Sequence, residues 1–354
     1  MTTAITSGET IGCDLGDKTS EICILSADGT MQRPEPVKTT RAAMRAFFTR
    51  APAHVVIETG THSRWMSELL KELGHRVTVA NPRRVKLISA SDSKQDRTDA
   101  ELLARLGRAD EMLLAPIEHR AEQAQADLAV AKARDVLVRC RTKLVNQARG
   151  MVKAFGERLP KCAAENFHRS ARDYIPEVLR PALKPIFRTL AELEKQIKAH
   201  DKTLERMSKR YPEVEALTQV NGVGLLTALV YMLTIDDKTR FKKSRTAGAF
   251  IGLRPRKDQS GDSDKQLRIT KAGDPFLRRL LVGSANYTLG PFGTDSDLRR
   301  WGLELARRGG KNAKKRATVA VARKLAVLLH RLWVTGEVYQ PLGYGKIAEA
   351  QQAA

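Results

Sequence analysis

The stretch Ile11-Gly12-Cys13-Asp14-Leu15-Gly16 decides the fold that we predict for this chain. An apolar run that closes on one acid is typical of a buried strand with a carboxylate at its end. Burying such an acid is costly unless it is paired or binds a metal ion. A second run of this kind, Val55-Val56-Ile57-Glu58, follows further along the chain. The two runs predict two strands that each present one carboxylate.

Two more acids stand in Lys94-Gln95-Asp96-Arg97-Thr98-Asp99, directly before a helical pattern. Residues three apart lie on one face of a helix, so Asp96 and Asp99 are expected to share a face. Together with Asp14 and Glu58 they would form an oxygen-rich pocket that suits Mg²⁺, with Mn²⁺ as a substitute. Paired ions of this kind clamp the attacking and leaving oxygens of a phosphodiester displacement. The pattern is typical of RNase H-like nucleases and integrases.

Each acid also has an ordinary explanation. Asp96 and Asp99 would complement the dipole at a helix N-terminus. Asp14-Leu15-Gly16 also fits the phosphate-binding turn of actin-like sugar kinases, which share the core topology. Kinases of that class need glycine-rich adenosine loops later in the chain, and we identify none in this sequence. The four acids together therefore favour a metal site.

The segments around these acids predict an α/β catalytic domain over residues 1–112. Alternating hairpin strands and helices indicate a sheet with mixed pairing. Strands are expected at 10–16, 19–26, 54–58 and 76–80, with another opening at Gly29, and helices at 40–50, 62–73 and 96–106.

Residues 113–210 predict a helical arm made of two long amphipathic helices. Stripes of coiled-coil type run along residues 121–155 and 186–209 and predict a homodimer. His200 falls on the second stripe, where we expect it to pack between helices. Residues 156–185 hold four prolines and predict a broken connection. The stripes consist of Leu137, Leu144, Ala148, Met151 and Phe155 in the first helix and Leu190, Leu193, Ile197, Leu204 and Met207 in the second.

Residues 211–345 predict a mostly helical C-terminal domain. Val220-Asn221-Gly222-Val223-Gly224 precedes an apolar helix at 225–233, and its backbone N–H groups either bind a phosphate or form a packing turn. Both explanations stay open. Residues 299–331 hold eleven Lys and Arg and a single acid, Glu304.

The net charge of +22 is unevenly distributed. Residues 1–110 hold 16 Lys and Arg against 14 Asp and Glu, whereas the remainder holds 46 against 26. A basic surface of this kind favours a polyanion and salt-dependent binding. An acidic membrane is the weaker candidate, because we see neither an apolar span of membrane length nor a signal peptide. We therefore expect nucleic acid, and no membrane, as the partner.

The cysteine usage predicts a reducing compartment. The four cysteines lack metal-ligand spacing, and Cys13 and Cys23 lie in apolar strand-like runs. Buried free thiols are typical of cytoplasmic proteins. We expect a bacterial, cytoplasmic protein associated with the nucleoid.

A second candidate site surrounds Ser260. The loop from Gly252 to Gly261 contains Arg254-Pro255-Arg256-Lys257 and leads to Arg268-Ile269-Thr270-Lys271-Ala272-Gly273-Asp274. A serine ringed by cations is either a solvated loop residue or a nucleophile whose attack on phosphorus is helped by positive charge. The residues alone leave both open.

The order of these motifs carries a resemblance to a known family. An Asp-x-Gly strand, Glu-Thr-Gly after an apolar strand, Lys-x-Asp-x-x-Asp-Ala, a coiled-coil middle and Gly-Leu-x-Pro…Ser-Gly…Ile-Thr-Lys-x-Gly follow one another from about residue 10 to 335. In this the chain resembles DEDD transposases of the insertion-sequence one-ten type. These are bridge-RNA-guided recombinases related to pilin-gene invertases.

The resemblance implies a function for each candidate residue. Asp14, Glu58, Asp96 and Asp99 would bind Mg²⁺ in a RuvC-like domain, and Ser260 would become covalently joined to DNA. A non-coding bridge RNA would pair with donor and target DNA, and two dimers would form the active tetramer. Many members carry Ser-Ser-Gly where this chain has Gln259-Ser260-Gly261, and Ser263 is a rival nucleophile.

Two alternatives to RNA-guided recombination remain. The first is a structure-selective nuclease resembling Holliday-junction resolvases, which uses metal-activated water and forms no covalent intermediate. The second is a non-catalytic nucleic-acid-binding protein with a decayed site. The complete set of acids and the intact Ser260 favour the recombinase.

Overall fold

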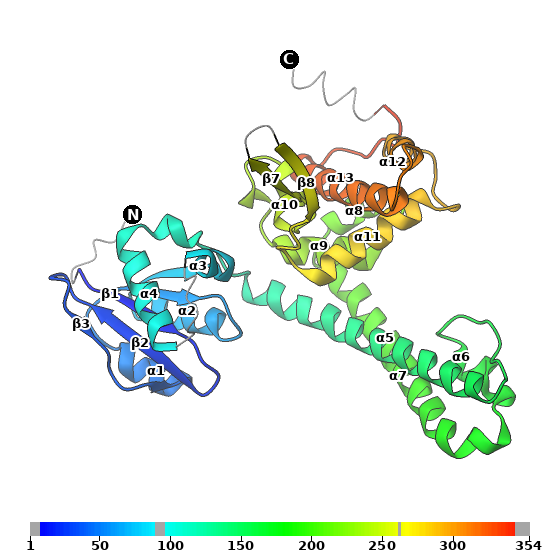
Figure 1. Cartoon of the computed structure of the whole chain (residues 1–354), viewed down its shortest axis with the longest axis horizontal. Helices are drawn as coiled ribbons and strands as arrows, with labels where there is room; N and C mark the ends of the chain where they lie inside the picture. Colours follow the sequence, from blue (N-terminus) through cyan, green and yellow to red (C-terminus); the bar gives the residue numbers. More distant parts are fainter. Residues whose placement is uncertain (1–7, 89–95, 261–262, 344–354) are drawn as a thin grey trace. The chain divides into compact units, whose positions relative to one another are not determined.

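The computed structural model describes residues 8–88, 96–260 and 263–343, and the chain forms two compact units. The first unit is Met1–His119 and the second is Arg120–Ala354 (Figure 1). Because the arm and the C-terminal helices belong to one unit, their separation into domains 113–210 and 211–345 stays a prediction.

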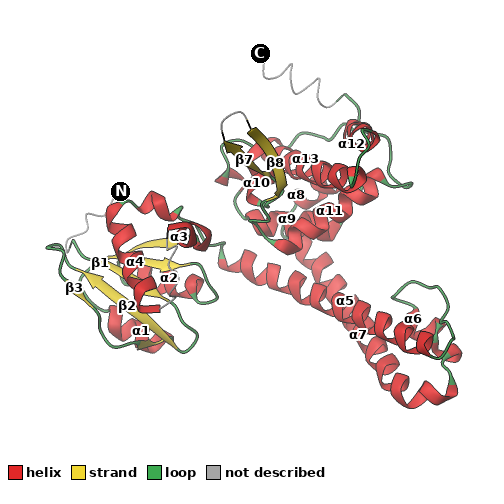
Figure 2. Cartoon of the chain, viewed as in Figure 1, coloured by secondary structure: helices red, strands yellow, loops and turns green. Residues whose placement is uncertain are grey.

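A single mixed sheet organises the first unit, with strand order β3-β2-β1-β5-β6 and β4 beside β2 (Figure 2). β1 pairs antiparallel with β2 and parallel with β5, and β5 pairs parallel with β6. The prediction of mixed pairing is therefore confirmed. The strands are β1 Thr10–Asp14, β2 Thr19–Leu25, β3 Met31–Gln32, β4 Val37–Lys38, β5 His54–Glu58 and β6 Arg76–Ala80.

Helices cover both faces of this sheet, because side chains alternate between the two faces of each strand. Ile11 and Ile57 face a core shared with α1 and α2. Val56 faces the other way and packs against Leu103 of α4. The helices of this unit are α1 Arg41–Phe48, α2 Ser63–Glu72, α3 Pro82–Ile88, α4 Asp96–Ala109 and the 3₁₀ turn η1 Glu111–Leu114.

Two glycines allow α4 to lie directly on the sheet. A Cβ added at Gly12 of β1 would lie 2.0 Å from the carbonyl oxygen of Ala100 in α4. A Cβ added at Gly107 of α4 would lie 2.4 Å from Cγ2 of Val56 in β5. Real Cβ atoms do not approach other atoms this closely, so each contact requires glycine. The backbones of β1 and α4 are thereby held in direct contact.

The second unit begins with two long helices that pack against each other within the chain. They are α5 Glu122–Ala154 and α7 Arg180–Ser208. Arg134 pairs with Asp201 at 2.7 Å, and Arg141 pairs with Glu194 at 2.6 Å. Both pairs join residues in opposite chain order, so the helices are antiparallel. The connection contains α6 Phe167–Ser170 and two 3₁₀ turns, η2 Arg172–Tyr174 and η3 Glu177–Leu179.

The predicted stripe of α5 is buried in part. Ala148 is buried as predicted, whereas Leu144 and Met151 are half-buried and Phe155 is 53% exposed. Val145 and Val152, one position along from Leu144 and Met151, are more deeply buried. Arg141, seven residues before Ala148, is also buried, and it pairs with Glu194.

The predicted stripe of α7 is largely confirmed, since Leu190, Ile197, Leu204 and Met207 are buried. These side chains are already covered within one chain. They cannot serve as an open dimer seam, and dimerisation of the chain stays a prediction.

The remaining helices surround α9, which is buried from Thr227 to Ile235. The hydroxyl of Tyr231 donates a 2.5 Å hydrogen bond to the carbonyl oxygen of Ala326 in α13. Within the described ranges, no helix is both long enough and apolar enough to cross a bilayer. The elements are α8 Glu213–Thr218, α9 Leu225–Ile235, η4 Lys238–Arg240, α10 Arg245–Phe250, β7 Pro255–Ser260, β8 Ser263–Ile269, α11 Pro275–Leu289, α12 Asp297–Arg307 and α13 Ala313–Thr335.

Candidate active site

Asp14 and Glu58 lie together at the carboxyl edge of the sheet. They end the neighbouring parallel strands β1 and β5, in which Cys13 pairs with Ile57. Alternation along each strand places Asp14 on the same face as Gly12 and Glu58 on the same face as Val56. That face is the one covered by α4. Both acids are half-buried, and the structure brings them to one edge and one face.

The N-terminus of α4 lies toward the same edge. Near its end, Gly107 approaches the first residues of β1 and β5, Thr10 and His54, whereas Ala100 lies over Gly12 further along β1. The helix therefore runs opposite to both strands, and its first turn is nearest to their carboxyl ends. Asp99 is half-buried in this part of α4. Asp96 begins the helix, and its side chain lies outside the described residues.

The chemistry of this edge is that of oxygen ligands. Among the side chains that the structure describes, no three His, Cys, Asp or Glu groups are close enough together to hold a metal ion. That set does not include the side chain of Asp96. Burial, followed by the negative charge of Asp14, raises the pKa of Cys13 far above its ordinary value. Cys13 alternates onto the other face of the sheet, in the core with Ile11 and Ile57, so its thiol points away from the face that carries the acids.

A histidine that sequence reasoning missed bridges the two loops at this edge. Nε2 of His62, which precedes α2, lies 3.8 Å from Oδ1 of Asp17 in the loop after β1. Nε1 of Trp65 donates a 3.1 Å hydrogen bond to Nδ1 of His62. Because Nδ1 accepts that bond, a neutral His62 carries its proton on Nε2, facing Asp17. The only sequence signal was a histidine three residues before a tryptophan at a helix start.

Ser260 lies at the end of a strand, and the prediction that it occupies a loop is wrong. Residues 255–260 form β7, which pairs with β8, and Ser260 is opposite Ser263 in the register. The side chains from Arg256 to Ser260 are exposed. The hairpin was missed because the residues of β7 from Arg256 to Ser260 are all polar and show no apolar alternation. The two candidate nucleophiles are thus paired across the hairpin, and the side chain of Ser263 lies outside the described residues.

The base of this hairpin is a backbone clasp, formed by Gly252 and residues 271–273. Gly252 has φ +79°, and a Cβ there would lie 2.3 Å from the backbone nitrogen of Ala272. A Cβ at Gly273 would lie 2.1 Å from the carbonyl oxygen of Phe250. The Lys271 N–H donates a 3.0 Å hydrogen bond to the carbonyl oxygen of Gly252. The glycines of both quoted motifs therefore hold the two ends of the hairpin together.

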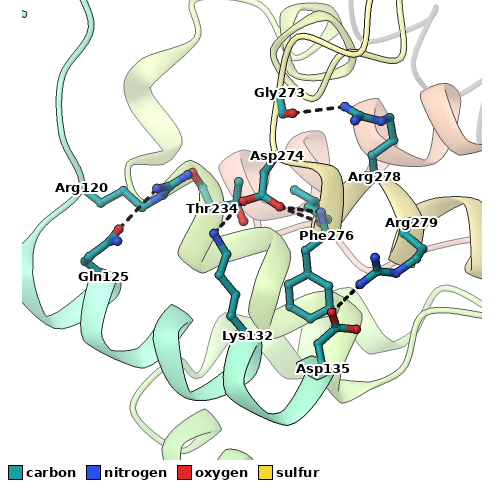
Figure 3. A network of polar contacts seen from close by, with 11 residues as sticks. Arg120, Gln125, Lys132, Asp135, Thr234, Gly273, Asp274, Phe276, Arg278 and Arg279 are labelled. Carbon is teal, nitrogen blue, oxygen red and sulfur yellow. Dashed lines mark hydrogen bonds and ion pairs between the residues drawn. The ribbon is translucent and has the colours of Figure 1, made fainter. Parts of the chain in front are cut away.

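Asp274 connects the clasp to the long helix α5 (Figure 3). Its carboxylate caps α11 by accepting hydrogen bonds from Phe276 N–H at 2.8 Å and Leu277 N–H at 3.0 Å. Nζ of Lys132 in α5 lies 3.0 Å from the same carboxylate. Burial alone would raise the pKa of Asp274, but the Leu277 N–H and the Lys132 ammonium outweigh it and lower that pKa. The carboxylate is therefore held in its ionised form.

Two arginines of α11 extend this network. Arg278 donates to the carbonyl oxygen of Gly273 at 3.2 Å (Figure 3). It also donates to the carbonyl oxygen of Ile251 at 3.0 Å, on the other side of the clasp. Arg279 pairs with Asp135 of α5 at 2.6 Å. The hairpin that carries Ser260 is thus tied to the start of α11 and to α5 by charged side chains.

The comparisons with known proteins agree with this arrangement. A family model for DEDD transposases of IS110, described as transposase, matches residues 11–156. A second model, described as the transposase IS116/IS110/IS902 family, matches residues 214–291. A probable family 20 transposase of Pseudomonas aeruginosa is 30% identical over 315 residues, which are 85% of this chain and 90% of that protein. The chain belongs to the IS110 family of transposases.

Other relatives span nearly the whole length of this IS110-family transposase. The transposase for insertion sequence element IS1111A of Coxiella burnetii is 27% identical over 337 residues, 93% of this chain and 91% of that protein. The pilin gene-inverting protein of Moraxella bovis is 23% identical over 330 residues, 90% of this chain and 93% of that protein. The resemblance drawn from the sequence is therefore confirmed, and the chain is a DNA transposase of an insertion sequence.

Two candidate positions have packing explanations in this IS110-family transposase. His200 is half-buried, and its Nδ1 bonds to the carbonyl oxygen of Gln196 on its own helix at 2.9 Å. Gly222 has φ +86°, and a Cβ there would lie 2.9 Å from the carbonyl oxygen of Ser284 in α11. The turn before α9 therefore needs glycine for close packing, which favours the packing explanation over a phosphate site.

Proposed function

We propose that this transposase is an RNA-guided, site-specific DNA recombinase with a metal site in the first unit and a covalent nucleophile in the second. Asp14, Glu58, Asp96 and Asp99 would hold Mg²⁺, or Mn²⁺ as a substitute, and Ser260 would attack DNA. One observation carries the metal half of the proposal: Asp14 and Glu58 share an edge and a face of the sheet with the N-terminal turn of α4.

The topology of the first unit supports an RNase H-like, RuvC-like domain. Three antiparallel strands are followed by two parallel ones in the order β3-β2-β1-β5-β6, with a helix packed directly on the central strand. β1 and β5 are the third and fourth strands in that order, and both end on an acid.

The donor set fits a hard divalent cation, because its members are carboxylate oxygens. Bound Mg²⁺ would stabilise the charge that develops on a phosphodiester during displacement. The role of the chain is to hold two carboxylates on rigid strand ends and two on a helix that glycine contacts fix against β1.

Ser260 would conserve the energy of the cleaved phosphodiester bond. Its Oγ forms a bond to phosphorus as one bridging P–O bond of the DNA breaks. The serine proton is transferred to the departing DNA oxygen, which leaves as a hydroxyl group. In the reverse sense, a hydroxyl of another DNA strand attacks the serine ester and regenerates Ser260. Cleavage and joining therefore balance without an external energy source.

The partners would be donor DNA, target DNA and a guide RNA, the bridge RNA of the insertion element. Residues 111–354 hold 46 Lys and Arg against 26 Asp and Glu, which suits polyanions. Guide pairing would select the sequence, while the protein would contact backbone and shape. A homodimer through the arm, and a tetramer of two dimers, would have to use exposed arm residues, because the stripes of α5 and α7 are covered.

The test is an SDS-stable protein–DNA adduct formed by the full chain with its co-purified RNA and Mg²⁺. Wild type should give the adduct, whereas Ser260→Ala and Asp14→Asn should not, and Ser263→Ala should. Mixing Ser260→Ala with Asp14→Asn protein should restore some adduct if protomers share sites. An adduct that persists in Ser260→Ala and disappears in Ser263→Ala would transfer the role to Ser263. Cleavage by wild type without any adduct would favour the resolvase-like alternative.

A further inference from the structure

A basic cavity of about 970 Å³ opens in the second unit, between α10, β7, α13 and residues 339–341. Its cationic side chains come from three separate elements, so no single helix face accounts for them. They are Lys243 and Arg245 at the start of α10, Arg254 and Lys257 beside and within β7, and Arg323, Lys324 and Arg331 in α13.

The charge of this basic cavity is balanced only in part: Arg331 pairs with Glu337 at 2.9 Å. Asp297 is the one acid in the lining. Over residues 8–88, 96–260 and 263–343, no carboxylate forms an ion pair with Lys243, Arg245, Arg254 or Arg323. Like charges held this close repel one another unless an anion lies between them. The cavity is therefore suited to a ligand that carries more than one negative charge.

The lining of the basic cavity also contains apolar side chains. Ala249, Val327 and Leu328 contribute to it, and Tyr339 adds an aromatic ring. Cations that follow a backbone, combined with aromatic and apolar surface for bases, are typical of sites for single-stranded nucleic acid. The volume is at the upper end of small-ligand pockets, which suits a few nucleotides of one strand and not a double helix.

We propose that the basic cavity binds the phosphodiester backbone of a single DNA strand that leads to Ser260. β7 lines the cavity through Pro255 and Lys257, and the same strand ends at Ser260. A strand lying in the cavity therefore continues along β7 toward the serine. The choice of DNA as occupant rests on the proposed function, in which Ser260 reacts with DNA.

The test compares two variants of the full-length protein that lose the same charge. Lys243→Gln/Arg245→Gln removes two exposed cations of the basic cavity, and Lys184→Gln/Arg188→Gln removes two exposed cations of α7. Fluorescence anisotropy measures the binding of labelled oligodeoxythymidylate over a salt titration. The cavity variant should bind about tenfold more weakly, with a salt slope smaller by about 1.4 for two lost phosphate contacts. The α7 variant should keep the wild-type slope.

Three outcomes would overturn the proposal. If both variants bind DNA equally weakly, the loss of affinity comes from the lower net charge and not from the cavity. A larger loss for oligouridylate of equal length would identify RNA as the occupant, and a larger loss for duplex DNA would exclude a single-strand site. Repeating the titration with Ser260→Ala separates this proposal from the function proposed above. Suppose that the cavity variant binds DNA more weakly than wild type, but that wild type forms no covalent adduct. That result would refute the chemistry proposed for Ser260 and leave the cavity site standing.

Discussion

Replacing Asp274 with alanine tests how the serine hairpin is held. The substitution removes an N-cap with two backbone hydrogen bonds, which contributes about 1 kcal/mol. It also removes the ion pair with Lys132, in which the Asp274 side chain is 10% exposed and the Lys132 side chain 46% exposed. A half-exposed pair of this kind contributes about 1 kcal/mol. The free energy of unfolding of the second unit should therefore fall by about 2 kcal/mol.

Differential scanning calorimetry measures this effect directly. For a unit of this size, about 2 kcal/mol corresponds to a melting temperature lower by about 4–8 °C. Asp274→Asn keeps an N-cap oxygen and loses the charge, so it should cause about half of the shift. Glu205→Ala, at an exposed position of α7, is the matched control and should melt with the wild type. If the second unit of Asp274→Ala also melts at the wild-type temperature, Asp274 does not stabilise the clasp through its N-cap and its ion pair with Lys132.

The difference in melting temperature between wild type and Asp274→Asn should also depend on pH. The pKa of Asp274 is lower in the folded protein than its ordinary value of 3.8, so its ionised form stabilises the fold. That stabilisation is present above the ordinary pKa and is lost as the pH falls through the folded pKa. The gap in melting temperature between wild type and Asp274→Asn should therefore be constant near neutral pH and close on strong acidification. A gap that widened in acid would contradict this reasoning.

Three further predictions concern the packing of the two units. Arg141→Met should cost about 3–5 kcal/mol in urea unfolding, because the buried Glu194 loses its 2.6 Å partner and keeps only the longer 3.8 Å pair with Lys198 among the described ion pairs, and Arg141→Met/Glu194→Leu should recover most of that loss. Gly12→Ala should abolish the cooperative melting of the first unit and DNA cleavage together, since its Cβ would lie 2.0 Å from the Ala100 carbonyl oxygen; a normal melt by circular dichroism would be the contrary result. Ile197→Glu should destabilise the single chain by about 3–5 kcal/mol, because it buries a charge at a position that is 2% exposed. Loss of mass by light scattering at unchanged helix content would instead identify Ile197 as a dimer contact.

The sheet and the edge that carries Asp14 and Glu58 could be predicted from the sequence. An apolar run of strand length that ends on an acid is typical of a buried strand with a carboxylate at its end. The strands predicted at 54–58 and 76–80 match the structure. The contact between Gly12 and α4 could not be predicted, because a glycine within a strand indicates close approach without naming the partner. Register and helix direction come from the packed structure alone.

The arm and the hairpin show where sequence patterns fail for physical reasons. Arg141 occupies a core position that hydrophobic periodicity assigns to an apolar residue, because its ion pair with Glu194 allows the charge to be buried. In the hairpin at 255–269 the side chains from Arg256 to Ser260 are exposed, and backbone pairing and the clasp at Gly252 hold the strands. Patterns of hydrophobicity report burial of apolar surface, and these positions bury none.

The ion pairs of the arm fix the register of its two helices and so the length of the arm. Arg134 and Arg141 are one heptad apart on α5, and their partners Asp201 and Glu194 are one heptad apart on α7. Shifting one helix by a heptad along the other would keep one ion pair and leave the other two charges unpaired. The two pairs therefore fix the register of the helices. At 1.5 Å per residue, the 33 residues of α5 fix a span of about 50 Å. Whatever the tip of the arm contacts is therefore held at a set spacing from the helices that carry the serine hairpin.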